Sequence, residues 1–214
     1  MTRFARRSVH LPGIFERLFN QLRGTEQLLV RAGDDLPLLL ISFPRGTLPV
    51  AREIEAAFAH ILSGLGEEIR APYAALFESL PVMVVILLRP SNPCGCLGHH
   101  HPPGTESRLT KRLIADLGDS IGEIDLAYES IRNWRPQPLS SLAAGELGGR
   151  LPAIHFQAAT LAVLLHELEH LGFPGKTEQE IRTKSNDFYS AVMGELVAGE
   201  WGAAYGMAAP APRP

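Results

Sequence analysis

The stretch IHFQAATLAVLLHELEHL, residues 154–171, decides the fold that we expect for this chain. It is apolar over most of its length. Gly172 directly after it and Pro174 two residues later are residue types that often end helices. A helix this apolar belongs in the interior of a protein. The sequence therefore predicts a long buried helix whose last turns carry two histidines and two glutamates.

A second helix is expected directly after the first. Thr177 and Glu180 have the spacing of a capping box, so this helix should begin near Thr177 and end near Gly199. Two successive helices with a short connection form an antiparallel hairpin. The residues that follow, 206–214, form an Ala/Pro tail that we expect to be disordered.

Strand and helix patterns are mixed in the rest of the chain. Four stretches are typical of strands, and the first two should form a hairpin: 27–32, 36–43, 82–88 and 121–131. Four stretches have the apolar spacing of helices: 11–22, 50–69, 71–80 and 108–117. Two further stretches rich in turn residues should be a loop or irregular edge and a linker or weak helix: 91–104 and 136–149.

The two later strands differ in their expected environment. Residues 82–88 are β-branched and Leu-rich, which is typical of a strand in the middle of a sheet. In 121–131, apolar residues alternate with Glu123 and Asp125, so one face of this strand should contact water. Together the elements predict an α+β fold, a small mixed sheet with packed helices, in a single domain over residues 1–205.

Composition and charge narrow the possible functions. With 45% hydrophobic and 20% charged residues, the chain has the balance of a soluble globular protein. Its net charge of -3 gives no support for binding nucleic acid, and no run approaches the roughly 20 apolar residues of a membrane span. Cys94 and Cys96 lie too close for a relaxed mutual disulfide, so we expect a reducing compartment, the cytoplasm.

The end of the long helix has the pattern of a metal site. His166 and His170 lie one turn apart on one face, where two imidazoles can bind one tetrahedral metal ion. Glu167 is well placed to accept a proton from a water that the metal polarises. In the alternative interpretation, the helix end is solvated and Glu167 and Glu169 only pair with the imidazoles. Acidic residues near a helix C-terminus are unfavourable, which suggests a compensating cation.

Residues 163–171 resemble the active-site helix of the zincin metallopeptidases, which carries the H-E-x-x-H motif. The resemblance covers roughly residues 121–199. It implies a Zn²⁺ ion held by the two histidines, Glu167 as the general base, and a protein or peptide substrate. It also implies an edge strand beside the site, here the strand around residues 123–131.

The chain departs from the zincin pattern in two respects. Zincins usually have an uncharged residue where this chain has Glu169. The metzincin continuation would need a glycine in place of Phe173 and a histidine in place of Lys176, so a metzincin is excluded. The remaining branch is gluzincin-like, in which a carboxylate on the following helix completes the metal site.

Four carboxylates compete as the third ligand. Glu180 is the preferred candidate and Glu178 the next, because a sharp connection would bring the start of the last helix level with the histidines. Glu180 has a competing role as the N3 residue of the capping box. Asp187 lies farther along, and Glu195 is expected to be buried, roughly 27 Å from the hairpin and near His155.

The sequence CGCLGHHH adds a second group of possible metal ligands: Cys94, Cys96, His99, His100 and His101. Such a group can bind zinc or copper, but its spacing matches no zinc-finger pattern. The segment could line the active-site cleft, form a second metal site or be a solvated loop. His10 and His60 are taken as ordinary surface residues.

Three functions follow from these patterns. The leading hypothesis is a zinc-dependent peptidase of gluzincin-like architecture that hydrolyses a peptide bond. The alternative is a non-catalytic module that keeps the zinc for structure, or has lost it, and binds a partner protein through its first ninety or so residues. The third is a metal sensor built on the cysteine and histidine segment.

Overall fold

The protein is described here by a computed structural model that covers residues 25–31, 36–61, 64–118, 120–134 and 151–204. Several predicted features lie outside these described residues: the helix over 11–22, the turn at 33–35, the linker over 136–149, the tail over 206–214, and the side chains of His10 and His60.

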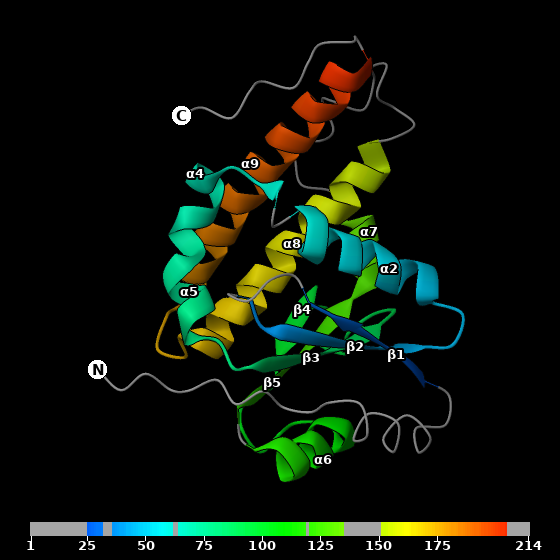
Figure 1. The fold of residues 1–214 in the computed structure, drawn as a ribbon, viewed down its shortest axis with the longest axis vertical. Coiled ribbons are helices and arrows are strands. Elements are labelled where there is room, and N and C mark those ends of the chain that lie inside the picture. The colour runs from blue at the N-terminus through cyan, green and yellow to red at the C-terminus, as the bar shows by residue number, and fades with distance from the viewer. Residues whose placement is uncertain (1–24, 32–35, 62–63, 119, 135–150, 205–214) are drawn as a thin grey trace.

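A five-stranded mixed sheet forms the centre of the fold (Figure 1). Its strands are β1 (Thr25–Val30), β2 (Leu38–Pro44), β3 (Met83–Arg89), β4 (Gly98–His100) and β5 (Ile121–Ala127). They lie in the order β1-β2-β3-β5-β4, with β2, β3 and β5 parallel and the two edge strands antiparallel to their neighbours. The predictions of a β1–β2 hairpin and of a central third strand are confirmed, as is the α+β class.

Helices cover both faces of the sheet (Figure 1). They are α2 (Leu48–Ala56), η1 (Ala57–Ile61), α4 (Glu67–Arg70), η2 (Ala71–Tyr73), α5 (Ala74–Ser79), α6 (Arg108–Leu117), α7 (Tyr128–Asn133), α8 (Leu151–Gly172) and α9 (Glu178–Ala204). The helix predicted over 50–69 is not continuous, because α2 passes into a single π-helical stretch, η1, and α4 begins only at Glu67.

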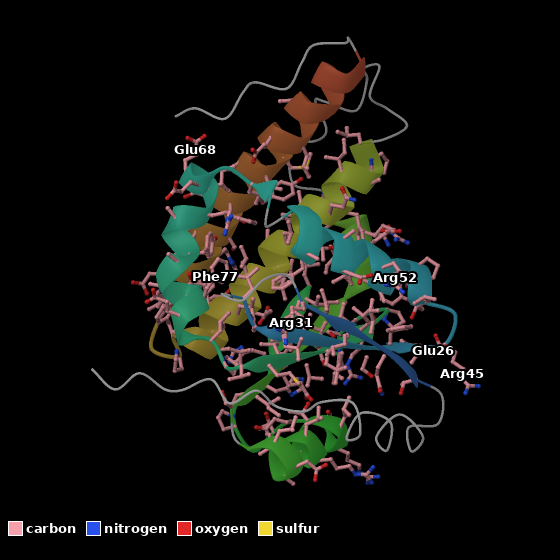
Figure 2. The ribbon with its side chains drawn as sticks, viewed as in Figure 1. Glu26, Arg31, Arg45, Arg52, Glu68 and Phe77 are labelled. Carbon is pink, nitrogen blue, oxygen red and sulfur yellow. A yellow bond between two sulfur atoms is a disulfide. The ribbon has the colours of Figure 1, made fainter. Side chains whose placement is uncertain are left out.

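Apolar side chains fill the space on each side of the sheet. Ile41, Ile86 and Ile124 belong to the main core beneath α8, and Leu40 and Val85 belong to a smaller core beneath α6. The strands of the middle of the sheet are thus apolar on both faces, as parallel strands covered by helices usually are. Charged side chains such as those of Arg45, Arg52 and Glu68 are exposed on the outside (Figure 2).

The long apolar stretch forms α8, as predicted, and α9 returns along it as the second arm of a helical hairpin (Figure 1). By length and composition alone α8 could cross a membrane, but 72% of its most apolar window is buried inside the fold. Gly172 ends α8 against α5: a Cβ there would lie 2.6 Å from Ser79 Oγ and 2.8 Å from Leu76 Cδ1.

Strand β5 differs from the expected strand with one wet face. It ends at Ala127, and both of its acidic side chains are buried, with exposed fractions of 0% for Glu123 and 5% for Asp125. Partners far away in the sequence explain this. Ser107 donates its backbone N–H to Glu123 Oε1 over 2.8 Å, and Arg89 Nε donates to Asp125 Oδ2 over 2.7 Å.

The edge of the sheet near α8 is β4 and not β5, which corrects the expectation drawn from the zincin resemblance. Strand β4 lies inside the stretch 91–104 that was expected to be a loop or an irregular edge. It pairs antiparallel with β5, with Gly98 opposite Leu126 and His100 opposite Ile124. A strand of three residues is too short to produce a recognisable alternation in the sequence.

The cysteines before β4 also differ from expectation. Cys94 and Cys96 were expected to lie too close for a relaxed mutual disulfide and to remain reduced, but a disulfide joins them, with their Cα atoms 5.3 Å apart. Gly95 between them has a φ of 72°, a conformation that favours glycine, and its N–H donates to Asn92 O over 2.9 Å. This tight turn brings the two side chains to the same side.

Candidate metal centre

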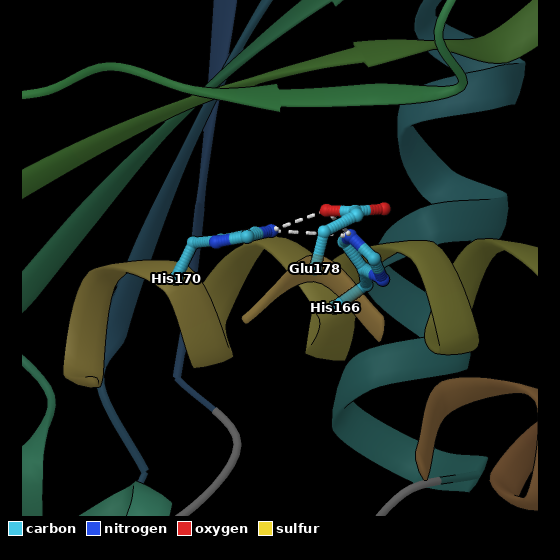
Figure 3. Close-up of side chains that lie close together, drawn as sticks. All are labelled: His166, His170 and Glu178. Atoms are coloured by element: carbon cyan, nitrogen blue, oxygen red, sulfur yellow. Dashed lines mark hydrogen bonds and ion pairs between the residues drawn. The ribbon is translucent and has the colours of Figure 1, made fainter. Parts of the chain in front are cut away.

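His166 and His170 project from the last turns of α8 toward the start of α9 (Figure 3). Their Nε2 atoms lie 3.3 Å apart, and their ring centroids lie 5.0 Å apart. Both side chains are 17% exposed, so they are accessible from solvent and also held by their surroundings. The helix repeat therefore places the two imidazoles together, as the sequence predicted.

Glu178, the first residue of α9, completes the group (Figure 3). Its Oε2 lies 3.1 Å from His170 Nε2 and 3.5 Å from His166 Nε2. Within the described part of the chain, these residues form the one set of three or more His, Cys, Asp or Glu side chains close enough to share a metal ion. The short connection between α8 and α9 is what brings the carboxylate over the histidines.

The spacing of these three atoms suits zinc. An ion with four tetrahedral ligands at about 2.0–2.1 Å separates its ligand atoms by about 3.3–3.4 Å. The three distances among the two Nε2 atoms and Glu178 Oε2 run from 3.1 to 3.5 Å. Two imidazoles and one carboxylate are also a donor set that zinc commonly binds. The residues present therefore fit the ion.

A hydrogen bond on the far side of His166 prepares it for metal binding. Its Nδ1 lies 3.2 Å from the hydroxyl of Ser185, which is buried in α9. Because that hydroxyl donates to Arg182 O over 3.1 Å, it accepts the proton of His166 Nδ1. The lone pair of His166 is then on Nε2, the atom that faces Glu178, as is usual for histidine ligands.

The charges around Glu178 favour its ionised form. Burial acts to raise its pKa, but the charge that His166 carries when it is protonated and hydrogen bonds from His170 and Arg182 outweigh this effect and lower the pKa. Arg182 Nη2 lies 3.1 Å from Glu178 Oε1, so one oxygen pairs with arginine while the other faces the histidines. A carboxylate binds metal in its ionised form. Glu178 is thus prepared for that role near neutral pH.

The other candidates for the third ligand lie elsewhere. Glu180, the preferred candidate, caps α9: its Oε2 accepts the Thr177 N–H over 2.8 Å, which confirms the predicted capping box. Hydrogen bonds from the Thr177 side chain and backbone lower the pKa of Glu180. Asp187 is exposed farther along α9. Glu195 is also exposed, although it was expected to be buried near His155. The Nδ1 atom of His155 pairs with Tyr189 Oη over 2.9 Å.

Glu167 and Glu169 are both buried, with exposed fractions of 6% and 1%. The interpretation of this region as a solvated helix end is therefore wrong. Glu167 points toward β4, where its Oε2 lies 3.7 Å from His100 Nδ1. Glu167 does not belong to the group of three converging ligand atoms.

Glu169 has its own pair of cations. Its carboxylate accepts hydrogen bonds from Lys176, over 2.5 Å, and from Lys184. Each ammonium group also lies over an aromatic ring, Lys176 at 4.1 Å from the Phe173 centroid and Lys184 at 4.0 Å from that of Tyr73. For Glu169, the compensating cation suggested by the sequence is therefore this lysine pair.

The cysteine and histidine segment does not act as one set of ligands. Cys94 and Cys96 are joined to each other, so their sulfurs are not thiolate ligands. His100 faces α8, while His101 faces the opposite side, where its Nε2 lies 3.4 Å from Asp125 Oδ1. The residue of this segment that contacts the candidate metal centre is His100, whose ring is stacked on that of His170.

Several functional contacts were missed in the sequence. Ser185 contacts His166 and Lys184 contacts Glu169, both from the same turn of α9. These contacts depend on how α9 packs on α8, and the spacing of apolar residues in the sequence does not reveal that packing. The sequence suggested that His99, His100 and His101 form one group of ligands. In a strand, successive side chains point to opposite faces, so His100 faces away from its two neighbours.

No family model, no curated protein and no solved structure matches this chain. The features of the candidate site are three converging ligand atoms, the buried Glu167 and the edge strand β4.

Proposed function

We propose that this protein is a zinc-dependent hydrolase of peptide bonds, with His166, His170 and Glu178 as the zinc ligands and Glu167 as the general base. The observation that carries the proposal is the convergence of three ligand atoms within 3.1–3.5 Å of one another. Catalytic zinc sites typically have three protein ligands and leave the fourth position open, whereas structural sites use four.

The chemistry follows from the residues around the proposed ion. When bound, zinc lowers the pKa of a coordinated water and polarises a carbonyl oxygen. Glu167 accepts a proton from the attacking water and can pass it to the amine that leaves. Its burial at 6% exposure limits the range of positions that the carboxylate can take. Ser185 keeps His166 in the tautomer that binds metal.

The choice of peptides as substrates rests on the zincin resemblance together with β4. In the zincins, an edge strand lies beside the active-site helix and holds an extended substrate by backbone pairing. Strand β4 occupies this place, since it lies at the end of the sheet and packs against α8. Among the described residues, β5 is its only strand partner, so its other edge can pair with an extended peptide.

The proposal is tested with two substitutions and one control. Glu167→Gln should bind Zn²⁺ like the wild type but lower the rate of hydrolysis of a peptide library by about 10²–10⁴-fold. Glu178→Gln should weaken Zn²⁺ binding at least about 100-fold, since even indirect contacts to a ligand can contribute this much. Asp187→Asn, which changes an exposed carboxylate elsewhere on α9, should alter neither property.

The readouts are zinc affinity, from competition with a chromophoric chelator, and cleavage of the library, followed by mass spectrometry. Full hydrolysis by Glu167→Gln would contradict its assignment as the base. Wild-type zinc affinity in Glu178→Gln would contradict the ligand set.

One observation favours a second candidate, a structural zinc. The ligands come from the end of α8 and the start of α9, so the ion would join the two arms of the hairpin. In that case wild-type protein would contain stoichiometric zinc and cleave no peptide in the library. Loss of zinc would then lower stability with no effect on any rate of hydrolysis.

A further inference from the structure

Strand β4 presents alternate residues to the metal centre. Gly98 and His100 face α8, while His99 between them is exposed on the opposite side. The main chain at Gly98 approaches Glu167 so closely that a Cβ atom there would lie 2.6 Å from Glu167 Oε1. The side chain that the strand carries on this face, that of His100, therefore contacts the end of α8 that bears the proposed site.

His100 contacts two residues of the proposed site at once. Its ring is stacked on that of His170, with the centroids 4.6 Å apart and the planes inclined by only 11°. Its Nδ1 lies 3.7 Å from Glu167 Oε2. A single imidazole thus packs on a metal ligand and faces the general base.

We propose that His100 is a positioning residue of the metal centre, which restricts the ring of His170 by stacking and faces the carboxylate of Glu167 with Nδ1 at 3.7 Å, a distance beyond a hydrogen bond but within reach of an electrostatic contact. This inference rests on the proposed function, because it assigns His100 a role within that same site. His100 does not serve as a fourth ligand here: its ring is parallel to that of His170, so its nitrogens do not point toward the atom that His170 faces.

The physical reason lies in the freedom of the two side chains that His100 contacts. Rotation of the His170 ring about its last side-chain bond would move Nε2 away from Glu178, and a parallel ring at stacking distance restricts this rotation. Glu167 has three rotatable side-chain bonds, and it is confined between the Gly98 main chain and the His100 ring. Metal sites depend on such outer contacts to orient their ligands.

Hydrogen bonds hold the strand that carries His100 in place. The strand pairs with β5, and the next residue, His101, donates its N–H to Glu123 O over 2.9 Å. The buried Glu123 side chain accepts bonds from Ser107 and Thr110 at the start of α6. The position of His100 is therefore supported by the sheet and, through Glu123, by α6 as well as by α8.

Three substitutions separate the two contacts. His100→Phe keeps a ring on His170 and removes the nitrogen near Glu167. His100→Asn keeps a polar nitrogen close to the position of Nδ1 and removes the ring. His100→Ala removes both. His99→Ala is the matched control, because it changes the neighbouring histidine on the exposed face of the same strand.

The expected results differ between the variants. His100→Phe should keep the zinc affinity of the wild type and lower kcat about tenfold, with little change in KM. His100→Asn should weaken zinc binding about tenfold. His100→Ala should do both, and these sizes are the lower end of what outer contacts usually contribute. His99→Ala should match the wild type. Circular dichroism spectra and thermal unfolding of each variant show whether it is folded.

The outcomes also separate this inference from the proposed function. Wild-type affinity and kcat in folded His100→Phe and His100→Asn would overturn the role of His100 and leave the hydrolase proposal standing. Zinc binding without hydrolysis by the wild type would contradict the proposed function. The stacking role would then be supported by weaker zinc binding in His100→Asn and overturned by unchanged binding. A wild-type chain that binds no Zn²⁺ overturns both.

Discussion

At the scale of single residues, Gly98 shows how the absence of a side chain lets the main chain approach the proposed general base, Glu167. A Cβ atom at this residue would lie 2.6 Å from Glu167 Oε1, 2.7 Å from Glu167 Cγ and 2.8 Å from Val163 Cγ1. Close-packed interiors do not accommodate such contacts without movement. Either the Glu167 carboxylate or the strand would have to shift.

Gly98→Ala should therefore lower kcat about 100-fold, since a displacement of about 1 Å at a reacting group can have an effect of this size. The loss of zinc affinity should be smaller, because the ligand atoms belong to α8 and α9. Gly194→Ala is the control, as a Cβ there meets nothing within 4 Å. A peptide-cleavage assay with full activity in Gly98→Ala would show that the close approach has no role.

At the scale of elements, the connection between α8 and α9 decides which carboxylate joins the histidines. Two residues along a helix correspond to a rotation of about 200°, so Glu178 and Glu180 point to nearly opposite faces. The capping box uses Glu180, and this places Glu178 toward α8. The sequence predicted the capping box and named both residues, but the rotation of α9 against α8 depends on packing that no local pattern reports.

Glu169 fixes this packing. It is 1% exposed at the end of α8, and its two lysine partners lie just before and within the first turns of α9. Removal of one partner leaves a buried carboxylate with fewer hydrogen bonds, which is costly. The pair of contacts therefore connects the stability of the hairpin with the position of Glu178.

Lys184→Met should lower the free energy of unfolding by about 1–3 kcal/mol and should also weaken zinc binding. Lys111→Met makes the same chemical change at an exposed site on α6 and should stay within about 0.5 kcal/mol of the wild type. Urea unfolding monitored by circular dichroism measures the free energy of unfolding of both variants. Equal stability of the two variants would show that Glu169 does not need Lys184.

At the scale of the whole molecule, the parts that could be predicted are those with a strong local signal. The long apolar stretch of α8, the β1–β2 hairpin and the apolar run of β3 each follow from consecutive residues. The burial of β5 could not be predicted from its sequence, because the partners of Glu123 and Asp125 are 16 and 36 residues away. Strand β4 was missed because three residues carry no period.

Zinc should also stabilise the entire fold if it binds the native state alone. At a free concentration about 100 times Kd, one bound ion contributes about 2.7 kcal/mol. For a chain of 214 residues, this corresponds to a rise in Tm of about 5–10 °C over protein treated with a chelator. Differential scanning calorimetry with and without zinc measures the shift. Glu178→Gln should show a much smaller one, and an equal shift would place the ion elsewhere.

The lysine pair around Glu169 has a consequence for how related sites are recognised in other genomes. The acidic residue two positions after the proposed general base is paired here with lysines that occur seven and fifteen residues later. A search pattern that demands a neutral residue at that position would discard such chains. A pattern that accepts an acid there whenever both lysines are present would retain them and would also mark the glutamate two residues after the first lysine as the third ligand.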